Sequence, residues 1–412
     1  MAAHLSTRGV HSGRDDLNDL GVHALPLDFS TTYPLSDLHA GRDDLARMAH
    51  GGHPEKSPVY ARLYNPTVGR FERAMANLES AAEAVAFGTG MAALTACLFA
   101  AQQRGSHVVA VRPLYGGSDH LLNSGLFKLD VTWATPETLA DHIRPETSLI
   151  ILETPANPTL RLTDIEQVVQ ASKGVAVLVD STFATPVLQR PIEHGATLVL
   201  HSATKFLGGH GDAMGGVVTT NSDWATSLRG VRVATGALLH PMGAYMLHRG
   251  LQTLAMRVER AQSSAKEIAL RLMEHASVER VFYPGIRSCD PTGLVGSQMS
   301  GPGSMLAFTL RGGFEEAAQV MESVTLFTAA VSLGSSDSLI QHPAGLTHLV
   351  VDEEISDEVG ISASMLRLSI GLEAPEDLWK DLSKALPSHR SACQNTRPAP
   401  RQSLQETFLS AS

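Results

Sequence analysis

Short apolar runs recur along the first half of the chain and are separated by segments with helical spacing. Each run is a few residues long and is followed by Gly, Pro, Ser or Thr. Continuous apolar strands that alternate with helices are typical of a parallel sheet covered on both faces. The pattern therefore predicts an α/β domain over residues 59–252, with a mostly parallel sheet. The runs are AEAVAF (82–87), HVVAV (107–111), LIILETP (149–155), VAVLVD (175–180) and TLVLHS (197–202).

The regions around these runs have different patterns. Residues 1–58 are mixed and rich in His, Gly and Asp, which predicts an extended arm with short helical pieces. Residues 67–80 have helical amphipathic spacing, and residues 248–275 predict one long helix. Two apolar runs and a helical segment then predict a smaller C-terminal α+β domain over 253–387; they are SMLAFTL (304–310), FEEAAQVMES (314–323) and SMLRLSIGL (364–372). The polar, Pro-containing tail 388–412 is predicted to be disordered.

Composition narrows the class of protein. The chain has 412 residues, with 32 Lys and Arg against 42 Asp and Glu, for a net charge of −10. Because there is no long basic run, we expect neither nucleic acid nor a membrane surface as a partner. Cys97, Cys289 and Cys393 lie far apart, which fits neither a disulfide framework nor a zinc site. The scattered histidines, His210 among them, lack ligand spacing, so no metal is expected. No secretory signal or window of ~18 apolar residues is present, and we expect a cytoplasmic protein.

The segment HSATKFLGGHGDAMGG (201–216) carries the strongest chemical signal. An apolar strand ends just before Lys205, at the edge where α/β folds place their ligands. Ser202 and Thr204 can bind a phosphate or orient the lysine amine, and the glycines let a ligand approach the backbone. These neighbours suit an amine that forms an imine. The alternative is a surface lysine in a flexible loop.

Two further segments could complete a cofactor site. Asp180 closes an apolar strand, where an unpaired carboxylate would be costly, and a pyridinium nitrogen would be a suitable partner. A capping Asp at a turn is the alternative. In FGTGMAALTACLFAA (87–101), a Gly-rich turn opens an apolar helix, and the N–H groups of Gly90 and Met91 would face an anion there. By itself such a turn is a weak signal.

Taken together, these segments resemble the transsulfuration family of pyridoxal-phosphate (PLP) enzymes, which includes cystathionine γ-synthase, cystathionine γ-lyase, methionine γ-lyase and O-acetylhomoserine sulfhydrylase. The resemblance runs from about Thr7 to Leu386. It implies PLP as cofactor and the aspartate-aminotransferase-like fold (fold type I), with a large α/β domain and a smaller C-terminal α+β domain. Further matching segments are YARLYNPT (60–67), LYGGS (114–118), ETPANPT (153–159), AVSLG (330–334), IQHPAGLTH (340–348) and LRLSIGLE (366–373).

Carried over position by position, the resemblance implies roles in cofactor binding. Lys205 would bind PLP covalently and later move protons, and Asp180 would pair with the pyridine nitrogen. Tyr115 would stack on the ring and act in proton transfer or leaving-group activation. The residues implied to bind the phosphate are Gly90, Met91, Ser202 and Thr204.

The resemblance also implies a substrate site and a partner subunit. Arg367 would hold the substrate carboxylate in a two-pronged ion pair, helped by Ser332 and Asn157. Tyr60 and Arg62 would reach the phosphate of the neighbouring subunit's cofactor, which implies a homotetramer built as a dimer of dimers. The alternatives are a surface salt bridge for Arg367 and simple anchoring of the arm by Tyr60 and Arg62. Tyr115 could likewise be a core aromatic residue.

The chain departs from the family pattern at positions that bear on the substrate. Cystathionine γ-lyases typically carry Glu where Val331 stands, which argues against cystathionine. The segments around residues 330–344 resemble methionine γ-lyases more, yet those enzymes carry Cys at the position of Gly117 and Asp at that of Val233. Ser181 also replaces the usual Asn. These departures favour a specialised γ-substituted amino acid, for example a γ-halogenated one, as one candidate substrate.

The resulting hypothesis is γ-elimination or γ-replacement on an L-amino acid with a leaving group at Cγ, such as methionine, a homoserine ester or cystathionine. One alternative is a β-lyase that acts on cystathionine or cysteine with the same cofactor. Another is a non-catalytic PLP-binding relative, which would be expected to lack Lys205, Tyr115 or Arg367. All three residues are present.

Overall fold

The computed structural model describes residues 3–347 and 360–387, and they form two compact units. Unit 1 contains Met1–Arg112, Leu121–Glu153 and Ile165–Met256. Unit 2 contains Pro113–His120, Thr154–Asp164 and the chain from Arg257 onward. The predicted disordered tail and His348, the last residue of the IQHPAGLTH segment, lie outside the described residues.

A seven-stranded sheet forms the centre of unit 1, in the order β1-β7-β6-β5-β4-β2-β3. Only β7 runs antiparallel to its neighbours, β1 and β6. The predicted strands and the mostly parallel sheet are confirmed, whereas β3 and β7 were not expected. The strands are β1 Glu83–Phe87, β2 His107–Val111, β3 Asp130–Ala134, β4 Thr147–Glu153, β5 Val177–Asp180, β6 Leu198–Ser202 and β7 Gly216–Thr220.

Apolar side chains from alternate positions of these strands form the core on one face of the sheet. Val109, Ile150, Val179 and Val199 belong to one fully buried cluster, which also contains residues of the helices that cover this face. Burial on the strands is nearly continuous, as the uninterrupted apolar runs predicted.

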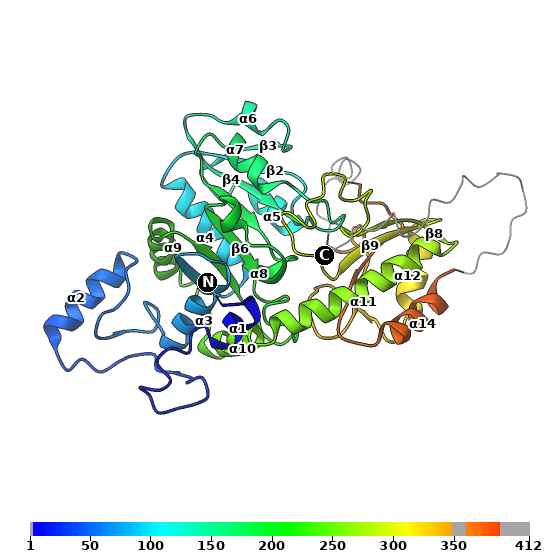
Figure 1. Ribbon diagram of the computed structural model, residues 1–412. Coiled ribbons are helices and arrows are strands. Elements are labelled where there is room, and N and C mark those ends of the chain that lie inside the picture. Colours follow the sequence, from blue (N-terminus) through cyan, green and yellow to red (C-terminus); the bar gives the residue numbers. More distant parts are fainter. Residues whose placement is uncertain (1–2, 348–359, 388–412) are drawn as a thin grey trace, which may run out of the picture. The chain divides into compact units, whose positions relative to one another are not determined.

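Helices connect and cover the strands of unit 1 (Figure 1). The predicted helix after residue 66 is confirmed as α3. Besides the helices of the first 58 residues, the helices that lie within unit 1 are α3 Pro66–Leu78, α4 Gly90–Gln102, α6 Leu139–His142, α7 Ile165–Ala171, α8 Thr185–Leu188, α9 Ser222–Thr235 and α10 Pro241–Leu251, with the 3-10 helix Pro191–His194. Helix α5 (Gly116–Asn123) begins in unit 2 and ends in unit 1.

The prediction of one long helix over residues 248–275 is wrong at its start. Helix α10 ends at Leu251, and α11 (Leu254–Glu274) begins three residues later. The last turn of α10 packs directly on a loop, because a Cβ on Gly250 would lie 2.4 Å from the Leu207 carbonyl oxygen. This tertiary contact fixes the end of α10 and cannot be read from helical spacing.

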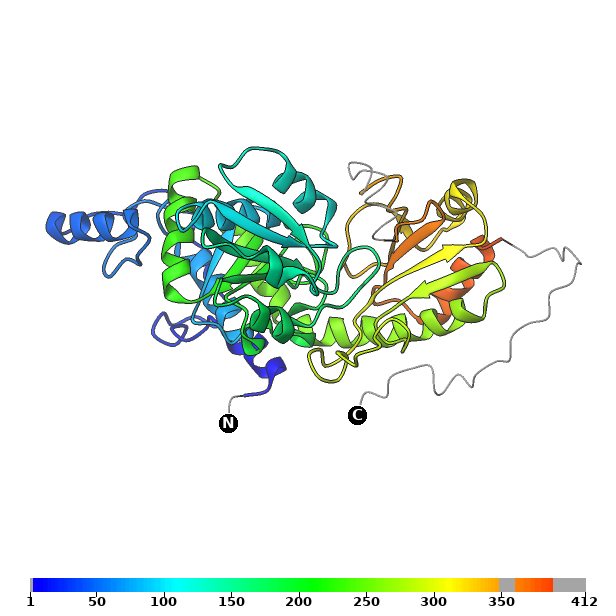
Figure 2. The ribbon, with the colours of Figure 1, turned by 90° about the horizontal axis from the view of Figure 1, so that it is seen from above.

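The first 58 residues contain α1 (Leu5–His11) and α2 (Leu38–Ala49). Helix α2 projects from the body of unit 1 in both views (Figures 1 and 2). The chain after α2 is fixed by the carboxylate of Asp44, which accepts the backbone N–H groups of Glu55, Lys56 and Ser57. These bonds hold the pKa of the Asp44 carboxyl below its usual range.

Unit 2 contains a five-stranded sheet in the order β10-β11-β12-β9-β8. Its pairs are antiparallel except β10 with β11. The predicted strands near residues 305 and 365 and the helix from residue 314 are confirmed. The elements are β8 Val278–Phe282, β9 Met305–Leu310, β10 Thr328–Ala329, β11 Leu339–Gln341, β12 Met365–Ser369, α12 Phe314–Ser323 and α14 Pro375–Ala385.

Two features of the described residues bear on possible partners. None of their helices combines the length and apolar character needed to cross a membrane. Within the same residues, no group of three or more His, Cys, Asp and Glu side chains is placed to hold a metal ion.

Candidate functional site

Lys205 lies in the turn that follows β6, three residues after the end of the strand. The turn is closed by backbone hydrogen bonds from Lys205 N–H to Ser202 O, at 3.1 Å, and from Gly209 N–H to Lys205 O, at 2.8 Å. Gly209 has a φ of +74°, a conformation that glycine adopts without strain. The turn therefore holds a partly buried lysine at the carboxyl end of a parallel strand, as predicted.

Asp180 ends the neighbouring strand, β5. Its Oδ1 accepts hydrogen bonds from the Thr182 hydroxyl at 2.6 Å and from the Thr182 backbone N–H at 3.0 Å. The Thr182 hydroxyl oxygen in turn accepts the N–H of Ser202 at 2.9 Å. A short relay of hydrogen bonds thus connects the end of β6 to the Asp180 carboxylate. A hydroxyl residue two positions after Asp180 is the sequence signal that could have predicted this relay.

The second oxygen of Asp180 is available to a ligand. No donor among the described residues bonds to Oδ2. Burial raises the pKa of the Asp180 carboxyl, and the Thr182 hydrogen bonds and the charge of His201 oppose that rise. A carboxylate in this position is stabilised by a protonated ring nitrogen, so the residue fits the cofactor that the sequence implied.

The start of α4 approaches the same strand ends. A Cβ on Gly90 would lie 3.0 Å from Ser202 Cβ, and one on Gly216 would lie 2.2 Å from Thr89 O. Thr89 caps the helix by accepting the Ala92 N–H at 3.0 Å. The N–H groups of Gly90 and Met91 come before that bond in the first turn, where a helix favours an anion. Glycine is thus needed to bring this anion-binding end beside Ser202.

The two hydroxyls assigned to the phosphate differ in their bonding. Thr204 donates its hydroxyl hydrogen bond to Gly215 O at 3.2 Å and accepts the Gly215 N–H at 3.1 Å. The Ser202 hydroxyl has no such partner among the described residues. Ser202 is therefore better placed than Thr204 to donate to an anion. We call Gly90, Asp180, Thr182, Ser202 and Lys205 the cofactor cluster.

Arg367 is the centre of a second cluster, which lies in unit 2. This arginine is on β12 and is 3% exposed. Its Nη1 donates to Asn157 Oδ1 at 2.7 Å, and its Nη2 donates to Ser332 O at 2.7 Å. Ser332 has a φ of +98°, a strained backbone conformation for a residue other than glycine. The structure thus brings together the three residues predicted to bind the substrate, which we call the arginine cluster.

Tyr115 also belongs to unit 2 and is 39% exposed. Its backbone oxygen accepts the N–H groups of Ser118 and Asp119 at the start of α5. The exposure argues against the alternative of a core aromatic residue. A Cβ on Gly117 would lie 2.5 Å from Cε1 of the Tyr115 ring. A glycine at position 117 therefore leaves room for the Tyr115 ring, which a larger residue there would displace.

Tyr60 and Arg62 are exposed side chains on the segment that follows the arm. The Arg62 guanidinium lies 5.7 Å from the centre of the Tyr60 ring, and Arg62 Nη1 donates to Val233 O at 2.9 Å. The pair is thus presented at the surface of unit 1 rather than packed in its core.

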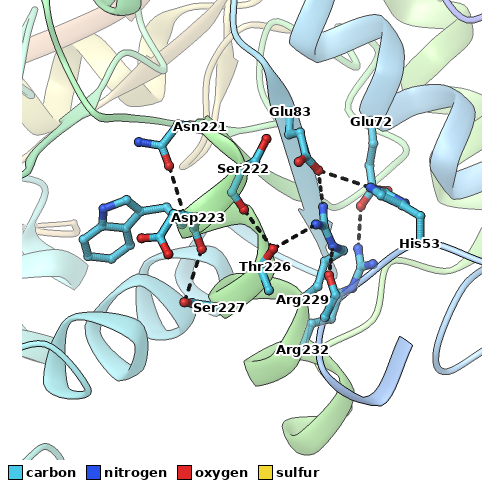
Figure 3. A network of polar contacts seen from close by, with 12 residues as sticks. His53, Glu72, Glu83, Asn221, Ser222, Asp223, Thr226, Ser227, Arg229 and Arg232 are labelled. Atoms are coloured by element: carbon cyan, nitrogen blue, oxygen red, sulfur yellow. Dashed lines mark hydrogen bonds and ion pairs between the residues drawn. The ribbon is translucent and has the colours of Figure 1, made fainter. Parts of the chain in front are cut away.

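A network of polar contacts connects the arm to β1 and α9 (Figure 3). Arg229 on α9 bonds to Glu83 and to the backbone oxygen of Gly51, and His53 lies 3.1 Å from the same Glu83 carboxylate. Arg232 pairs with Glu72 of α3. Both arginines are almost fully buried, so each needs its carboxylate partner.

Comparisons with known proteins identify the kind of chain to which this one is similar. The family model described as "Cys/Met metabolism PLP-dependent enzyme" matches residues 6–387. That span includes every residue of the two clusters.

Curated relatives cover nearly the whole chain. An L-methionine gamma-lyase of Brevibacterium sandarakinum is 56% identical over 94% of this chain and 99% of its own length. One from Streptomyces avermitilis is 52% identical over 94% of this chain and 90% of its own.

Solved structures show the same fold. A cystathionine gamma synthase from Xanthomonas oryzae pv. oryzae, in complex with aminoacrylate and cysteine, has a TM-score of 0.86 at 35% identity. It covers 93% of this chain and 98% of its own. A cystathione gamma lyase from Micromonospora echinospora has a TM-score of 0.84 at 34% identity. The match covers 93% of this chain and 99% of the lyase chain. The predicted fold of the PLP enzymes of fold type I is confirmed.

Proposed function

We propose that this chain, which belongs to the family of Cys/Met metabolism PLP-dependent enzymes, catalyses γ-elimination on L-methionine or a similar L-amino acid with a leaving group at Cγ. PLP is the cofactor of this family. The observation that carries the proposal is the cofactor cluster at the ends of β5 and β6, in a chain 56% identical to an L-methionine gamma-lyase. The family-level expectation of a carbon–sulfur lyase or synthase is confirmed.

The cofactor cluster fits PLP in three respects. Asp180 offers a carboxylate oxygen for the pyridine nitrogen, and Ser202 and the first turn of α4 offer donors for the phosphate. Lys205 supplies the amine for a covalent link. When bound, PLP accepts the electrons released as bonds at the substrate's α-carbon break.

The chain's own side chains would then position the substrate and move its protons. Arg367 binds the α-carboxylate through its guanidinium, which Asn157 and Ser332 hold in orientation. The Lys205 Nζ would remove the proton from the α-carbon, and a second proton leaves the β-carbon before the group at Cγ departs. The Tyr115 hydroxyl assists departure of the group at Cγ by donating a proton to its sulfur.

The substrate is the finer part of the proposal. Gly117, Val233 and Val331 favoured a substrate other than methionine or cystathionine. The relatives above 50% identity are named L-methionine gamma-lyases, and this supports methionine in spite of those departures. An amino acid with a different group at Cγ is the second candidate, because Gly117 permits a position of the Tyr115 ring that a side chain at residue 117 would obstruct.

The test is a substrate panel offered to the purified holoenzyme. It contains methionine, cystathionine, O-acetylhomoserine, O-succinylhomoserine and a γ-halogenated amino acid, with and without an added thiol. We expect 2-oxobutanoate, ammonia and methanethiol from methionine. New thioether in the presence of thiol would assign γ-replacement instead, and pyruvate from cystathionine would assign β-elimination. If no member of the panel is converted, the proposal is wrong.

We also propose that the active site is shared between two copies of the chain, within a dimer of dimers. Support comes from the exposed Tyr60 and Arg62 pair and from the apolar side chains that the arm presents to solvent. Exposed apolar residues of the arm include Val10, Leu20, Val22, Phe29, Leu35, Leu38 and Leu45. Apolar surface of this extent is typical of an interface.

Subunit mixing tests the sharing directly. Lys205→Ala and Arg62→Ala are purified separately, then dissociated and reassembled together. If Arg62 serves the neighbour's site, mixed dimers contain one site free of both substitutions, and activity returns. If both substitutions act within one subunit, the mixture stays inactive. Arg73→Ala, an exposed arginine of α3, is the control for Arg62→Ala.

The proposed location remains the cytoplasm. Cys97 is buried and Cys289 is partly buried, and within residues 3–347 and 360–387 neither forms a disulfide. Thiols kept apart in this way suit a reducing compartment.

A further inference from the structure

Glu79 and His201 form a buried pair that the proposed chemistry does not use. Glu79 is the residue that ends α3, and His201 lies on β6 directly before Ser202. His201 Nε2 lies 2.6 Å from Glu79 Oε1, and the side chains are 1% and 0% exposed. An ionisable side chain is costly to bury, so a buried carboxylate is usually paired with a cation or a hydrogen-bond donor.

Each member of the pair depends on the other. Among the described residues, neither Glu79 Oε2 nor His201 Nδ1 has a hydrogen-bond partner. The single contact between Oε1 and Nε2 therefore connects the two side chains to each other, and the charges of Arg8 and Arg190 also act on the Glu79 carboxylate.

The pair lies on the opposite face of the sheet from the cofactor cluster. Asp180 is in register with Leu200, so its side chain shares a face with Leu200 and with Ser202, two residues further along β6. His201 points to the other face, where Glu79 contacts it. His201 and Asp180 are on adjacent strands, and His201 follows directly after Leu200, the register partner of Asp180.

The charge of His201 acts on Asp180 through this short path. Burial raises the pKa of the Asp180 carboxyl, and the positive charge of His201 lowers it, in the same direction as the Thr182 hydrogen bonds. In a poorly solvated site, a nearby charge has a larger effect than it would have in water.

We propose that Glu79 and His201 are positioning residues that act from behind the sheet: the Glu79 carboxylate pairs with the charge of His201, and that charge favours the ionised Asp180 carboxylate, which faces the pyridine nitrogen. This inference rests on the proposed pairing of Asp180 with that nitrogen. It adds two residues to the cofactor site that touch neither cofactor nor substrate.

The test compares charge with shape at position 79. Holoenzymes are prepared with PLP labelled with ¹⁵N in the ring, and the ¹⁵N chemical shift reports whether the ring nitrogen is protonated. Glu79→Gln keeps the shape and removes the charge, and Glu79→Asp keeps the charge and shortens the side chain. We expect Glu79→Gln to move the shift toward that of the unprotonated ring, and Glu79→Asp to leave it near the wild-type value.

A second readout is the affinity for PLP itself. We expect Glu79→Gln to raise the dissociation constant of PLP roughly tenfold, which corresponds to about one pKa unit of differential interaction. Glu72→Gln is the matched control, because Glu72 is a buried carboxylate on the same helix that pairs with Arg232. It should change stability and leave the ¹⁵N shift unchanged.

The outcomes separate this inference from the proposed function. Asp180→Asn is measured beside the other variants. If Asp180→Asn leaves the ¹⁵N shift unchanged, the proposed role of Asp180 fails. If Asp180→Asn moves the shift and Glu79→Gln does not, only the present inference is overturned. Should Glu79→Gln not accumulate as holoenzyme, His201→Gln is measured in the same way, and a wild-type shift in it has the same meaning.

Discussion

The cofactor cluster of unit 1 and the arginine cluster of unit 2 are built in different ways. The first gathers short-range features at the ends of adjacent parallel strands, where Asp180 and Lys205 each follow an apolar run. The second joins three segments that are far apart in the chain, since Arg367 bonds to residues 210 and 35 positions away. One cluster depends on strand order, and the other depends on side-chain contacts.

This difference determines how each cluster should respond to substitution. Parallel strands are held by many backbone bonds, so the cofactor cluster keeps its geometry when one side chain is lost. The arginine cluster has a central cation, and removal of that cation leaves the Asn157 oxygen without its bond. We therefore expect losses of cofactor chemistry from the first cluster and losses of substrate binding from the second.

The largest expected effect is that of Lys205→Ala. The substitution removes both the covalent link to PLP and the base, and loss of general acid–base catalysis alone costs roughly 10²- to 10⁴-fold in rate. The visible absorbance of lysine-linked PLP should disappear while the chain keeps its fold. Absorbance and circular dichroism measure the two together. A variant that retains the wild-type visible spectrum would place the link on another lysine.

Arg367→Ala should come next and should separate the two clusters. Loss of one partner of a buried, hydrogen-bonded charge pair costs about 2–5 kcal/mol, which is roughly 30- to 4,000-fold in kcat/KM. PLP absorbance and affinity should remain close to wild type. Arg367→Lys is the control that keeps the charge without the two-pronged geometry. Its activity should fall between that of the wild type and that of Arg367→Ala. A loss of PLP affinity equal to the loss of kcat/KM would contradict the division into two clusters.

Gly90→Ala tests the close approach within the cofactor cluster. The added Cβ would lie 3.0 Å from Ser202 Cβ, and overpacking of this kind costs about 1–3 kcal/mol. We expect weaker PLP binding, measured by equilibrium dialysis. Gly230→Ala is the control, because it lies in α9 of the same unit and its Cβ would meet no atom within 4 Å. That variant should bind PLP normally and be slightly more stable, and equal losses in both variants would refute the steric argument.

The smallest expected effect is on the stability of unit 1, and it comes from His248, which lies outside both clusters. His248 is buried and lies 2.9 Å from Ser12 O, and burial lowers its pKa to about 4. The unfolded histidine binds a proton below about pH 6.5, while the folded one does not until about pH 4, so stability falls as the pH falls through this window. The loss should be about 2 kcal/mol at pH 5.

Hydrogen exchange at Ser12 and Gly13 measures this effect, with amides of the unit 2 sheet as the internal reference. Protection near Gly13 should decline between pH 7 and pH 5 more than protection in β9 or β12. His248→Gln should remove that excess decline, because glutamine does not titrate. The same decline in the variant would assign the pH dependence to another group.

The apolar pattern of the sequence predicted some elements of the fold and missed others. The strands β1, β2, β4, β5 and β6 were predicted because buried parallel strands are continuous apolar runs. The strands β3 and β7 were not predicted. Strand β3 is only partly buried, and β7 begins with Gly216, where a Cβ would collide with Thr89 O. The break after Leu251 was missed because helical spacing continues through it.

The candidate residues were recognised by position, and their contacts were not. The sequence placed Asp180 and Lys205 at strand ends, but the Thr182 relay depends on the distance between β5 and β6. It named Arg367, Asn157 and Ser332 only by resemblance, because no local pattern joins them. The Glu79 and His201 pair gave no signal at all, since the two residues are 122 positions apart.

The sequence by itself determined the alternation of strands and helices, the strand-end positions of Asp180 and Lys205, and the family and its cofactor. These features depend on local spacing and on contiguous motifs. Only the tertiary structure decided which oxygen of Asp180 is available, why residue 90 must be glycine, what orients Arg367 and which charge lies behind the sheet. Each of these depends on distances between segments that the chain order leaves open, and folding sets those distances by packing the strands and helices together.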